Sequence, residues 1–251
     1  MTSSKSRSFQ HPALTVDLVV LAQREGGLSV LLVKRGAHPF AGSWALPGGF
    51  VKVGEAADPS LEHAARRALQ KETGLDADDV ELMQIRTFDA PQRDPRMRVI
   101  ITVFAALLKP EWLPFLRAGD HEHEAVFHPI QTIRSDEISL AFDHQHILHL
   151  TLERCKRELS NSDFAFSLLR HAFTVSELRS VISGLSGQVL DAANFQRRVK
   201  KLLNEGRVIK TGEYRTTSRK PAALYRFVQS DVKSNVQSNV PSNVKSKEKT
   251  S

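Results

Sequence analysis

The chain has 251 residues, of which 41% are hydrophobic and 25% are charged, and its formal net charge is +7 at pH 7. These proportions are ordinary for a soluble globular protein, and the length suffices for one or two domains with hydrophobic cores. The longest apolar run, Val99–Leu108, is far shorter than the roughly 20 residues that span a bilayer, and residues 1–12 lack the apolar stretch of a secretory signal. Cys155 is the single cysteine, which excludes an internal disulfide and a cysteine-based zinc site. We therefore expect a cytoplasmic protein without a membrane partner.

Residues 12–139 show a pattern of strands with few helices, after a polar and flexible arm at residues 1–11. A helix is expected from Pro59 to Thr73, with Asp58 as its N-cap, Pro59 at its first position and Gly74 at its end. Runs of β-branched and aliphatic residues predict strands on both sides of this helix. These strands are Thr15–Gln23, Ser29–Lys34, Leu82–Phe88 and Arg98–Leu108.

The stretch from Trp44 to Leu75, WALPGGFVKVGEAADPSLEHAARRALQKETGL, holds the most informative motif of the chain. It resembles the Nudix box, G-x5-E-x7-R-E-U-x-E-E-x-G-U, in which U is a bulky aliphatic residue. In Nudix hydrolases this loop and helix bind magnesium and cleave nucleoside diphosphates linked to another group. Ala68 and Lys71 replace two of the glutamates, and eleven residues instead of seven separate Glu55 from Arg67. The residues that match are Gly49, Glu55, Arg67, Leu69, Glu72, Gly74 and Leu75.

The two substitutions remove most of the charge that would bind a metal. In the Nudix pattern three glutamates lie on one face of the helix, where their oxygens suit Mg²⁺. Here positions 68, 71 and 72 offer a methyl group, an ammonium and one carboxylate. We expect Glu72 to pair with Lys71, with Arg67 or with backbone amides. The sequence therefore predicts no catalytic residues, no metal site beyond weak Mg²⁺ binding, and a fold that is kept to bind a ligand.

A linker helix is expected within residues 140–160, from Phe142 to Leu159. At the other end of the chain, residues 229–251 repeat Ser-Asn-Val without enough apolar content for a core, which predicts a disordered tail.

Residues 161–228 read as helices followed by a hairpin. The first helix is expected at Phe164–His171, and the second begins with Thr174 and Glu177, whose spacing is that of a capping box. The third is expected at Asp191–Asn204 and ends before Gly206. Two strands around a polar loop follow, between Val208 and Val228. This order of elements predicts a winged helix-turn-helix.

Positive charge is concentrated in the same segment. Residues 164–228 carry twelve Lys or Arg against four Asp or Glu, a net of +8, whereas residues 1–163 carry a net of −3. The helix Asp191–Asn204 has one apolar face and one face of amide and basic side chains, as in helices that enter the major groove. We therefore expect binding to double-stranded DNA. The expected contact residues are Thr174, Ser176, Asn194, Gln196, Arg197, Arg198, Lys201, Arg215, Arg219 and Lys220.

A degenerate Nudix domain followed by a winged helix resembles the NrtR family of Nudix-related transcriptional regulators. The resemblance covers residues 12–228 and implies an α+β fold, a Nudix-like α/β/α sandwich followed by a winged helix-turn-helix. It also implies a homodimer that binds palindromic operators, represses genes of NAD metabolism and senses ADP-ribose or a related NAD metabolite. It rests on the segments PFAGSWALPGGFV (39–51), RDPR (93–96), LAFDH (140–144), FTVSEL (173–178) and DAANFQRRV (191–199).

Five residues are candidates for the ligand site. Arg35, Arg93 and Arg96 suit contact with a pyrophosphate, and Phe40 and Trp44 suit stacking on an adenine. Two alternatives stay open: the arginines at 93 and 96 can instead pair with Asp89 or Asp94, and the aromatic residues can belong to the core.

Other functions also fit the sequence. A working Nudix hydrolase with an accessory basic domain requires substitute metal ligands, such as Glu55, Glu72 and Glu122. The polar run at residues 120–124 is not expected to bind metal, because its two histidines lack a clear third ligand, and His144 and His146 are expected to be structural. A regulator of this architecture with a sugar as its effector remains an alternative. RNA binding is less favoured, because few aromatic residues are interleaved with the basic ones.

Overall fold

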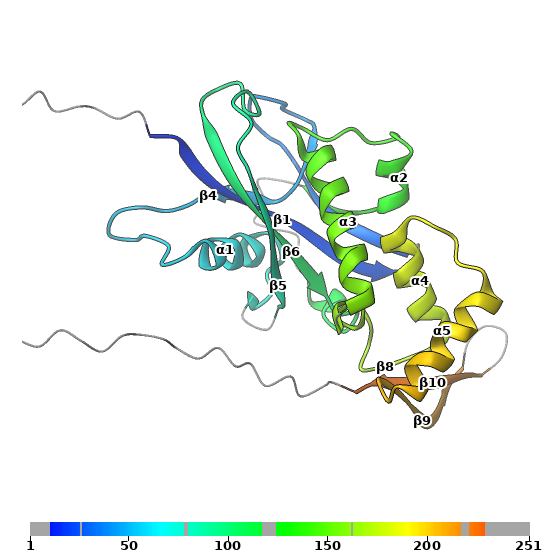
Figure 1. Cartoon of the computed structure of the whole chain (residues 1–251). Coiled ribbons are helices and arrows are strands. Elements are labelled where there is room, and N and C mark those ends of the chain that lie inside the picture. The colour runs from blue at the N-terminus through cyan, green and yellow to red at the C-terminus, as the bar shows by residue number, and fades with distance from the viewer. Residues whose placement is uncertain are drawn as a thin grey trace, which may run out of the picture.

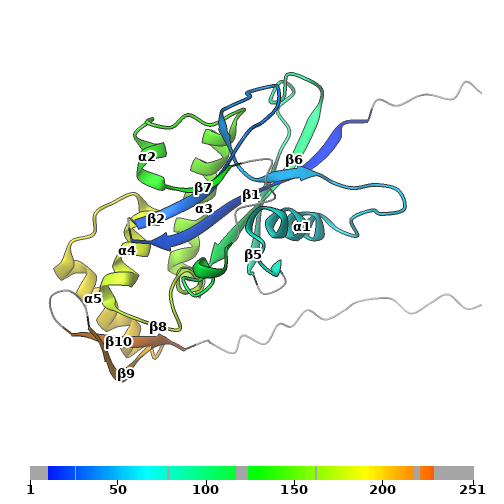
Figure 2. The ribbon, with the colours of Figure 1, turned by 180° about the vertical axis from the view of Figure 1, so that it is seen from behind.

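The computed structural model describes residues 11–25, 27–77, 80–116, 124–161, 163–216 and 221–228. A mixed sheet with helices on both faces is followed by a smaller unit of helices and a three-stranded sheet (Figures 1 and 2). This arrangement confirms the predicted α+β fold. None of the helices in these ranges combines the length and the hydrophobicity needed to cross a membrane.

Strand β1 (Ala13–Arg24) is the centre of a seven-stranded sheet. It pairs in parallel with β6 (Val99–Leu108) and antiparallel with β2 (Gly27–Lys34), and β5 (Leu82–Phe88) lies beyond β6. The four strands expected from the sequence are therefore present, with small shifts at their ends. Three short strands that the sequence did not indicate complete the sheet, namely β3 (Trp44–Ala45), β4 (Gly48–Phe50) and β7 (Ala125–Pro129).

The unbroken apolar run of β1 has a structural cause, because both faces of the sheet are covered. Val19 and Leu21 belong to one buried cluster and Leu18 and Val20 to another. Successive side chains of a strand point to opposite faces, so a strand that is covered on both sides is apolar at every position. The sheet therefore separates two hydrophobic cores.

Helix α1 (Leu61–Thr73) covers one face of the sheet. It ends as expected at Gly74, which has a φ of 68°. The predicted N-terminus is wrong: Ser60 is the N-cap, and its hydroxyl accepts a hydrogen bond from the backbone N–H of His63 at 3.1 Å. Asp58 instead accepts hydrogen bonds from the side chain of Arg67 at 2.6 and 2.9 Å. The aspartate thus fixes the loop before the helix to the helix itself.

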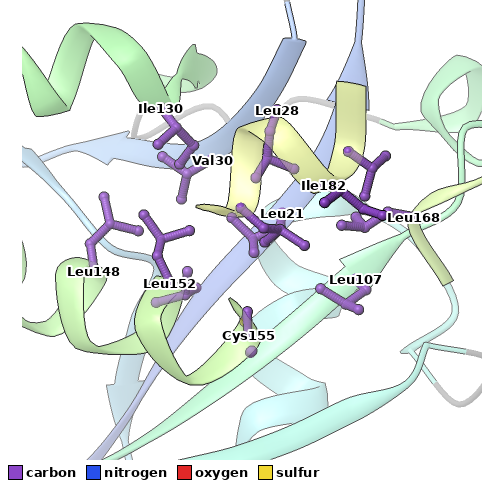
Figure 3. Packing of buried hydrophobic residues seen from close by; sticks show 14 of the residues in the cluster. Leu21, Leu28, Val30, Leu107, Ile130, Leu148, Leu152, Cys155, Leu168 and Ile182 are labelled. Carbon is purple, nitrogen blue, oxygen red and sulfur yellow. The ribbon is translucent and has the colours of Figure 1, made fainter. Parts of the chain in front are cut away.

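Helices α2 (Ile130–Arg134) and α3 (His144–Asn161) cover the other face. Leu148, Leu152 and Cys155 of α3 point towards β1, as Figure 3 shows. The linker helix begins two residues later than expected. Phe142 has a φ of 54°, in the left-handed region, and therefore cannot be part of a right-handed helix.

The smaller unit is a winged helix. It contains β8 (Ala172–Phe173), α4 (Val175–Ser186), α5 (Ala192–Asn204), β9 (Val208–Arg215) and β10 (Ala222–Phe227). The predicted capping box is confirmed, since the Thr174 hydroxyl accepts from the Glu177 N–H at 3.2 Å and the Glu177 carboxylate accepts from the Thr174 N–H at 2.7 Å. The helix expected at Phe164–His171 is a 3₁₀ helix, η3, at Asp163–Leu168. A second 3₁₀ helix, η2, lies at Leu113–Phe115.

Helix α4 packs directly on the large sheet, so that one hydrophobic core serves both units. Leu28 of β2 and Ile182 of α4 lie in the same buried cluster (Figure 3). The close approach requires a glycine on α4, because a Cβ at Gly184 would lie 2.5 Å from Cβ of Leu28. Arg134 of α2 donates to the carbonyl oxygens of Gly184 and Leu185 at 3.0 and 3.3 Å. These contacts hold the winged helix on the large sheet near the hairpin turn between β1 and β2.

Candidate functional site

A cavity of about 320 Å³ lies where β1, β4, the N-terminus of α3 and the C-terminal turn of α1 meet. We call it the cationic cavity because its five basic residues outnumber its three acidic ones. The basic residues are Lys34, Arg35, Lys71, Arg93 and Arg96, and the acidic residues are Asp17, Glu72 and Asp94. Three of the five predicted ligand residues therefore reach the same cavity.

Arg35 follows β2 and carries the least compensated charge of the cavity. Its guanidinium donates to the carbonyl oxygen of Pro39 at 2.8 Å and lies over the ring of Phe142, 4.7 Å from the centroid. No carboxylate within the described ranges forms a salt bridge with it. Burial and then the charge of Arg96 lower the pKa of Arg35, and the charges of Asp94 and Asp17 offset only part of this. An anion bound between the two guanidinium groups would relieve this repulsion.

Arg93 and Arg96 come from the turn between β5 and β6 and are held in place by aspartates. Arg96 donates to the Asp94 carboxylate at 2.8 and 3.0 Å, and these hydrogen bonds lower the pKa of Asp94. Arg93 donates to Asp143 at 2.6 and 3.1 Å, and its side chain is only 5% exposed. The ion-pairing alternative therefore applies to both arginines. The partner of Arg93 is a residue that the sequence did not suggest.

The two predicted aromatic contacts lie outside the residues that line the cavity. Phe40 packs edge-on against Phe142, with the ring centroids 4.8 Å apart. Trp44 packs in the same way against His128, at 4.4 Å. Trp44 follows the packing alternative, because it lies against the core. Phe40 is 44% exposed and lies in neither core cluster, so its stacking on an adenine stays a prediction. The aromatic residues that do line the cavity are Phe142 and the exposed Phe50 of β4.

A buried polar pair forms one wall of the cavity. Asp17, in the middle of β1, has a carboxylate Oδ2 that lies 3.2 Å from Nε2 of His144, the first residue of α3. The backbone N–H of Leu46 donates to Nδ1 of His144 at 2.9 Å. Since Nδ1 accepts a hydrogen bond, the ring proton lies on Nε2, the nitrogen that is close to Asp17. His144 therefore lines the cavity, although the sequence analysis assigned it a structural role.

Two residues of the Nudix-box helix reach the cavity, and their chemistry differs from that of the motif. Lys71 and Glu72 line the cavity, 3.9 Å apart between Nζ and Oε1, as expected from the sequence. Ala68 is buried in the core beneath α1. In the part of the chain that the structure describes, no three His, Cys, Asp or Glu residues are grouped to hold a metal ion, and Glu122 lies outside that part. The cavity side of α1, where Lys71 lies beside Glu72, does not fit a divalent cation.

Helix α5 presents the predicted DNA-contacting face to solvent. Phe195 and Val199 are buried against the rest of the winged helix. The exposed predicted residues are Asn194, Gln196, Arg197 and Lys201. Arg198 is only half-exposed, and burial together with the charge of Arg207 lowers its pKa. The helix thus offers a polar and basic surface to solvent.

The other residues that were predicted to contact DNA differ in their exposure and in their hydrogen-bond partners. Ser176 is exposed, whereas Thr174 is buried at the N-cap of α4. Arg215 donates to the Glu177 carboxylate and to the carbonyl oxygen of Ala172, each at 2.6 Å, so it ties the wing to α4. Arg219 and Lys220 lie outside the described residues.

Comparison with known proteins matches each of the two units to a domain family. A NUDIX domain model matches residues 11–150, and a model of the NrtR DNA-binding winged helix domain matches residues 165–227. The crystal structure of Shewanella oneidensis NrtR is 30% identical to this chain and has a TM-score of 0.66, covering 86% of this chain and 94% of that one. The chain belongs to the NrtR family.

Other proteins similar to this NrtR-family chain include a regulator and an enzyme. The ADPR responsive transcriptional repressor NtrR of Acinetobacter baylyi is 28% identical over 223 residues, which cover 89% of this chain and 85% of that protein. An ADP-ribose pyrophosphatase of Methanocaldococcus jannaschii is 38% identical over 145 residues, 57% of this chain and 75% of the enzyme. S. oneidensis NrtR has also been crystallised with a 27mer DNA, at a TM-score of 0.66 and 29% identity, over 86% of this chain and 93% of that one. Its NUDIX domain has been crystallised with ADP ribose, at a TM-score of 0.51 and 29% identity, over 61% of this chain and 94% of that one.

Three polar residues of this NrtR-family chain were missed by sequence reasoning. Asp143 and His144 belong to the quoted LAFDH segment, but their partners Arg93 and Asp17 come from distant parts of the sequence. A signal for Asp17 was nevertheless present, because a carboxylate inside the apolar run Val16–Leu21 needs a polar partner.

Proposed function

We propose that this chain is a DNA-binding transcriptional repressor whose Nudix domain senses ADP-ribose or a related NAD metabolite. The observation that carries the proposal is the pair of cations in the cavity: Arg35 has no salt-bridge partner within the described ranges and faces the charge of Arg96. A pyrophosphate would give Arg35 the anionic partner that it lacks and would add negative charge beside Arg96, which is already paired with Asp94. The family supports the DNA-binding role, and its member in S. oneidensis has been crystallised with ADP ribose and with DNA.

The proposed ligand is bound and not cleaved. Hydrolysis of a pyrophosphate in this fold uses a divalent cation to polarise a phosphoryl oxygen and to lower the pKa of the attacking water. Lys71 brings an ammonium group to the cavity wall where a carboxylate is needed, and Glu72 lies beside it. We therefore propose that the chain needs no metal cofactor and has no catalytic residues.

The assembly and the targets follow from the family resemblance. We propose a cytoplasmic homodimer that places two copies of α5 on a palindromic operator near genes of NAD metabolism. ADP-ribose alters DNA affinity only to the extent that its own affinity differs between the two arrangements of the dimer. The direction of that response is left to measurement.

The test is fluorescence anisotropy of the full chain with duplex DNA from upstream of its own gene. A scrambled duplex at the same salt concentration serves as the control, because the phosphate contribution to affinity depends on salt. We expect a preference for the natural duplex that ADP-ribose changes. The variant Arg35→Gln should keep DNA binding and lose the response, whereas Arg86→Gln, exposed on β5, should keep both. Binding that responds to a sugar but not to ADP-ribose would replace the proposed effector.

A hydrolase is the second candidate, because the M. jannaschii pyrophosphatase is 38% identical over the matched residues. The two functions are separated by incubating the chain with ADP-ribose and magnesium and measuring the release of AMP. Our proposal predicts no release above that of buffer. Magnesium-dependent turnover by the natural chain, together with no preference for the natural duplex, would establish the hydrolase instead.

A further inference from the structure

Asp17 is a carboxylate in a place where carboxylates are rare. It lies in the middle of β1, is 9% exposed, and has buried residues on both sides in the strand. Removing a carboxylate from water is unfavourable unless hydrogen bonds replace the lost hydration. The groups around the Asp17 carboxylate therefore indicate the role of this residue.

The two carboxylate oxygens of Asp17 have different neighbours. Oδ2 lies 3.2 Å from Nε2 of His144, whose ring orientation is fixed by the N–H of Leu46. Oδ1 accepts no hydrogen bond from the residues that the structure describes. It lies against the backbone of Gly48, where an added Cβ would come within 2.3 Å of it. The glycine therefore leaves room for this oxygen beside the cavity.

Asp17 shares the cationic cavity with Arg35. Both residues belong to its wall, and the charge of Asp17 raises the pKa of Arg35. A ligand with phosphates alone would gain from Arg35 and Arg96 but would bring further negative charge towards Asp17. A ligand that carries hydroxyl groups beside its phosphates would donate to Oδ1 and avoid this repulsion.

We propose that Asp17, positioned by His144, selects ligands in which a sugar is attached to the pyrophosphate, by accepting a hydrogen bond from a sugar hydroxyl at Oδ1. This inference rests on the proposed function, in which the cationic cavity holds the pyrophosphate. A site built to hydrogen-bond a hydroxyl rejects analogues without it, because its own polar group is then left unpaired. Asp17 would thus be a specificity-determining residue, and His144 a positioning residue.

The test compares two ligands on the variant Asp17→Asn, which keeps the shape of the side chain and removes its charge. Calorimetric titration of the full chain with ADP-ribose and with inorganic pyrophosphate gives both dissociation constants. We expect the substitution to weaken ADP-ribose binding by at least about tenfold and to leave pyrophosphate binding unchanged or tighter. Glu62→Gln is the matched control, because it makes the same chemical change on the exposed side of α1. It should change neither constant.

The opposite responses of the two ligands separate hydroxyl recognition from a structural role. If Asp17→Asn weakens both ligands alike, or strengthens both, Asp17 does not read a hydroxyl and the inference fails, while ADP-ribose binding by the natural chain still supports the proposed function. If the natural chain does not bind ADP-ribose, the proposed function fails and this inference fails with it.

A second measurement covers the case in which the variant does not fold. The natural chain is titrated with ADP-ribose analogues in which one or the other ribose is replaced by deoxyribose. At least one analogue should bind about tenfold more weakly than ADP-ribose. Equal affinity for all three compounds would overturn the inference without any substitution in the protein.

Discussion

The cationic cavity and helix α5 both present arginines, but they hold them differently. In the cavity, Arg93 and Arg96 are fixed by Asp143 and Asp94 before any ligand is present. On α5, Arg197 is exposed and forms no salt bridge with a carboxylate of the described residues. A cation that is already fixed loses little side-chain entropy when a ligand binds, and it suits a ligand of one geometry. A cation that is free to move can adapt to a phosphate backbone, and its binding depends strongly on salt. The cavity is therefore built for selectivity and the helix for electrostatic attraction.

The largest effect is expected from breaking the buried ion pair of the cavity. Arg93→Ala leaves Asp143 without its partner in a mostly buried place, and removal of one member of a buried pair costs about 3 kcal/mol or more. We expect the free energy of unfolding to fall by roughly this amount in urea denaturation. Arg197→Ala on α5 is the control and should leave stability within about 0.5 kcal/mol. Equal losses in both variants would remove the distinction between fixed and free cations.

On α5 the expected effects fall on DNA affinity and not on stability. Asn194→Ala and Arg197→Ala should each weaken binding to the natural duplex by about 1–3 kcal/mol if they contact base edges. Lys201→Ala should weaken natural and scrambled duplexes alike and lower the salt slope by about 1. Anisotropy titrations over a series of salt concentrations measure both quantities. A stability loss without a change in affinity would assign these side chains to packing.

The junction between the large sheet and the winged helix gives the next test. Gly184→Ala places a Cβ against Leu28, where the calculated separation is 2.5 Å, so β2 and α4 must move apart. Overpacking costs about 1–3 kcal/mol, and the better helix propensity of alanine offsets part of it. We expect a net loss of about 1–2 kcal/mol in unfolding free energy. Gly49→Ala, where an added Cβ meets nothing within 4 Å, is the comparison variant and should lose less.

The smallest effect is expected on the stability of the protein in acid, through the carboxylates that hold the arginines. Hydrogen bonds from Arg96 lower the pKa of Asp94, and those from Arg67 lower the pKa of Asp58. A folded pKa below the unfolded one means that the stabilisation is complete above the ordinary carboxyl pKa of about 3.9 and is lost as the pH falls through the folded pKa. Thermal unfolding between neutral pH and acid should therefore show a decline below about pH 4, reduced in Asp94→Asn. A decline that is unchanged in this variant would contradict the assignment.

Local patterns predicted the fold better than they predicted the site. Thr174 and Glu177 lie three residues apart, so their capping box follows from the sequence alone. The partners of the cavity residues lie far apart in the chain, because β1, the β5–β6 turn and the start of α3 meet only after the sheet forms. The pattern placed Arg35, Arg93 and Arg96 at the cavity and held a signal for Asp17, but it did not indicate that His144 lies beside this carboxylate. It also placed Asp58 at the helix N-terminus, where Ser60 forms a competing cap.

The buried thiol of α3 has a practical consequence. Burial raises the pKa of Cys155 to about 12, so almost none of it is thiolate at neutral pH, and the thiolate is the reactive form. A cysteine introduced on the exposed face of α5 would therefore be the group that a maleimide dye modifies. In the proposed homodimer, such a labelled chain would report the separation of the two copies of α5 by energy transfer, with and without ligand, without first removing the natural cysteine.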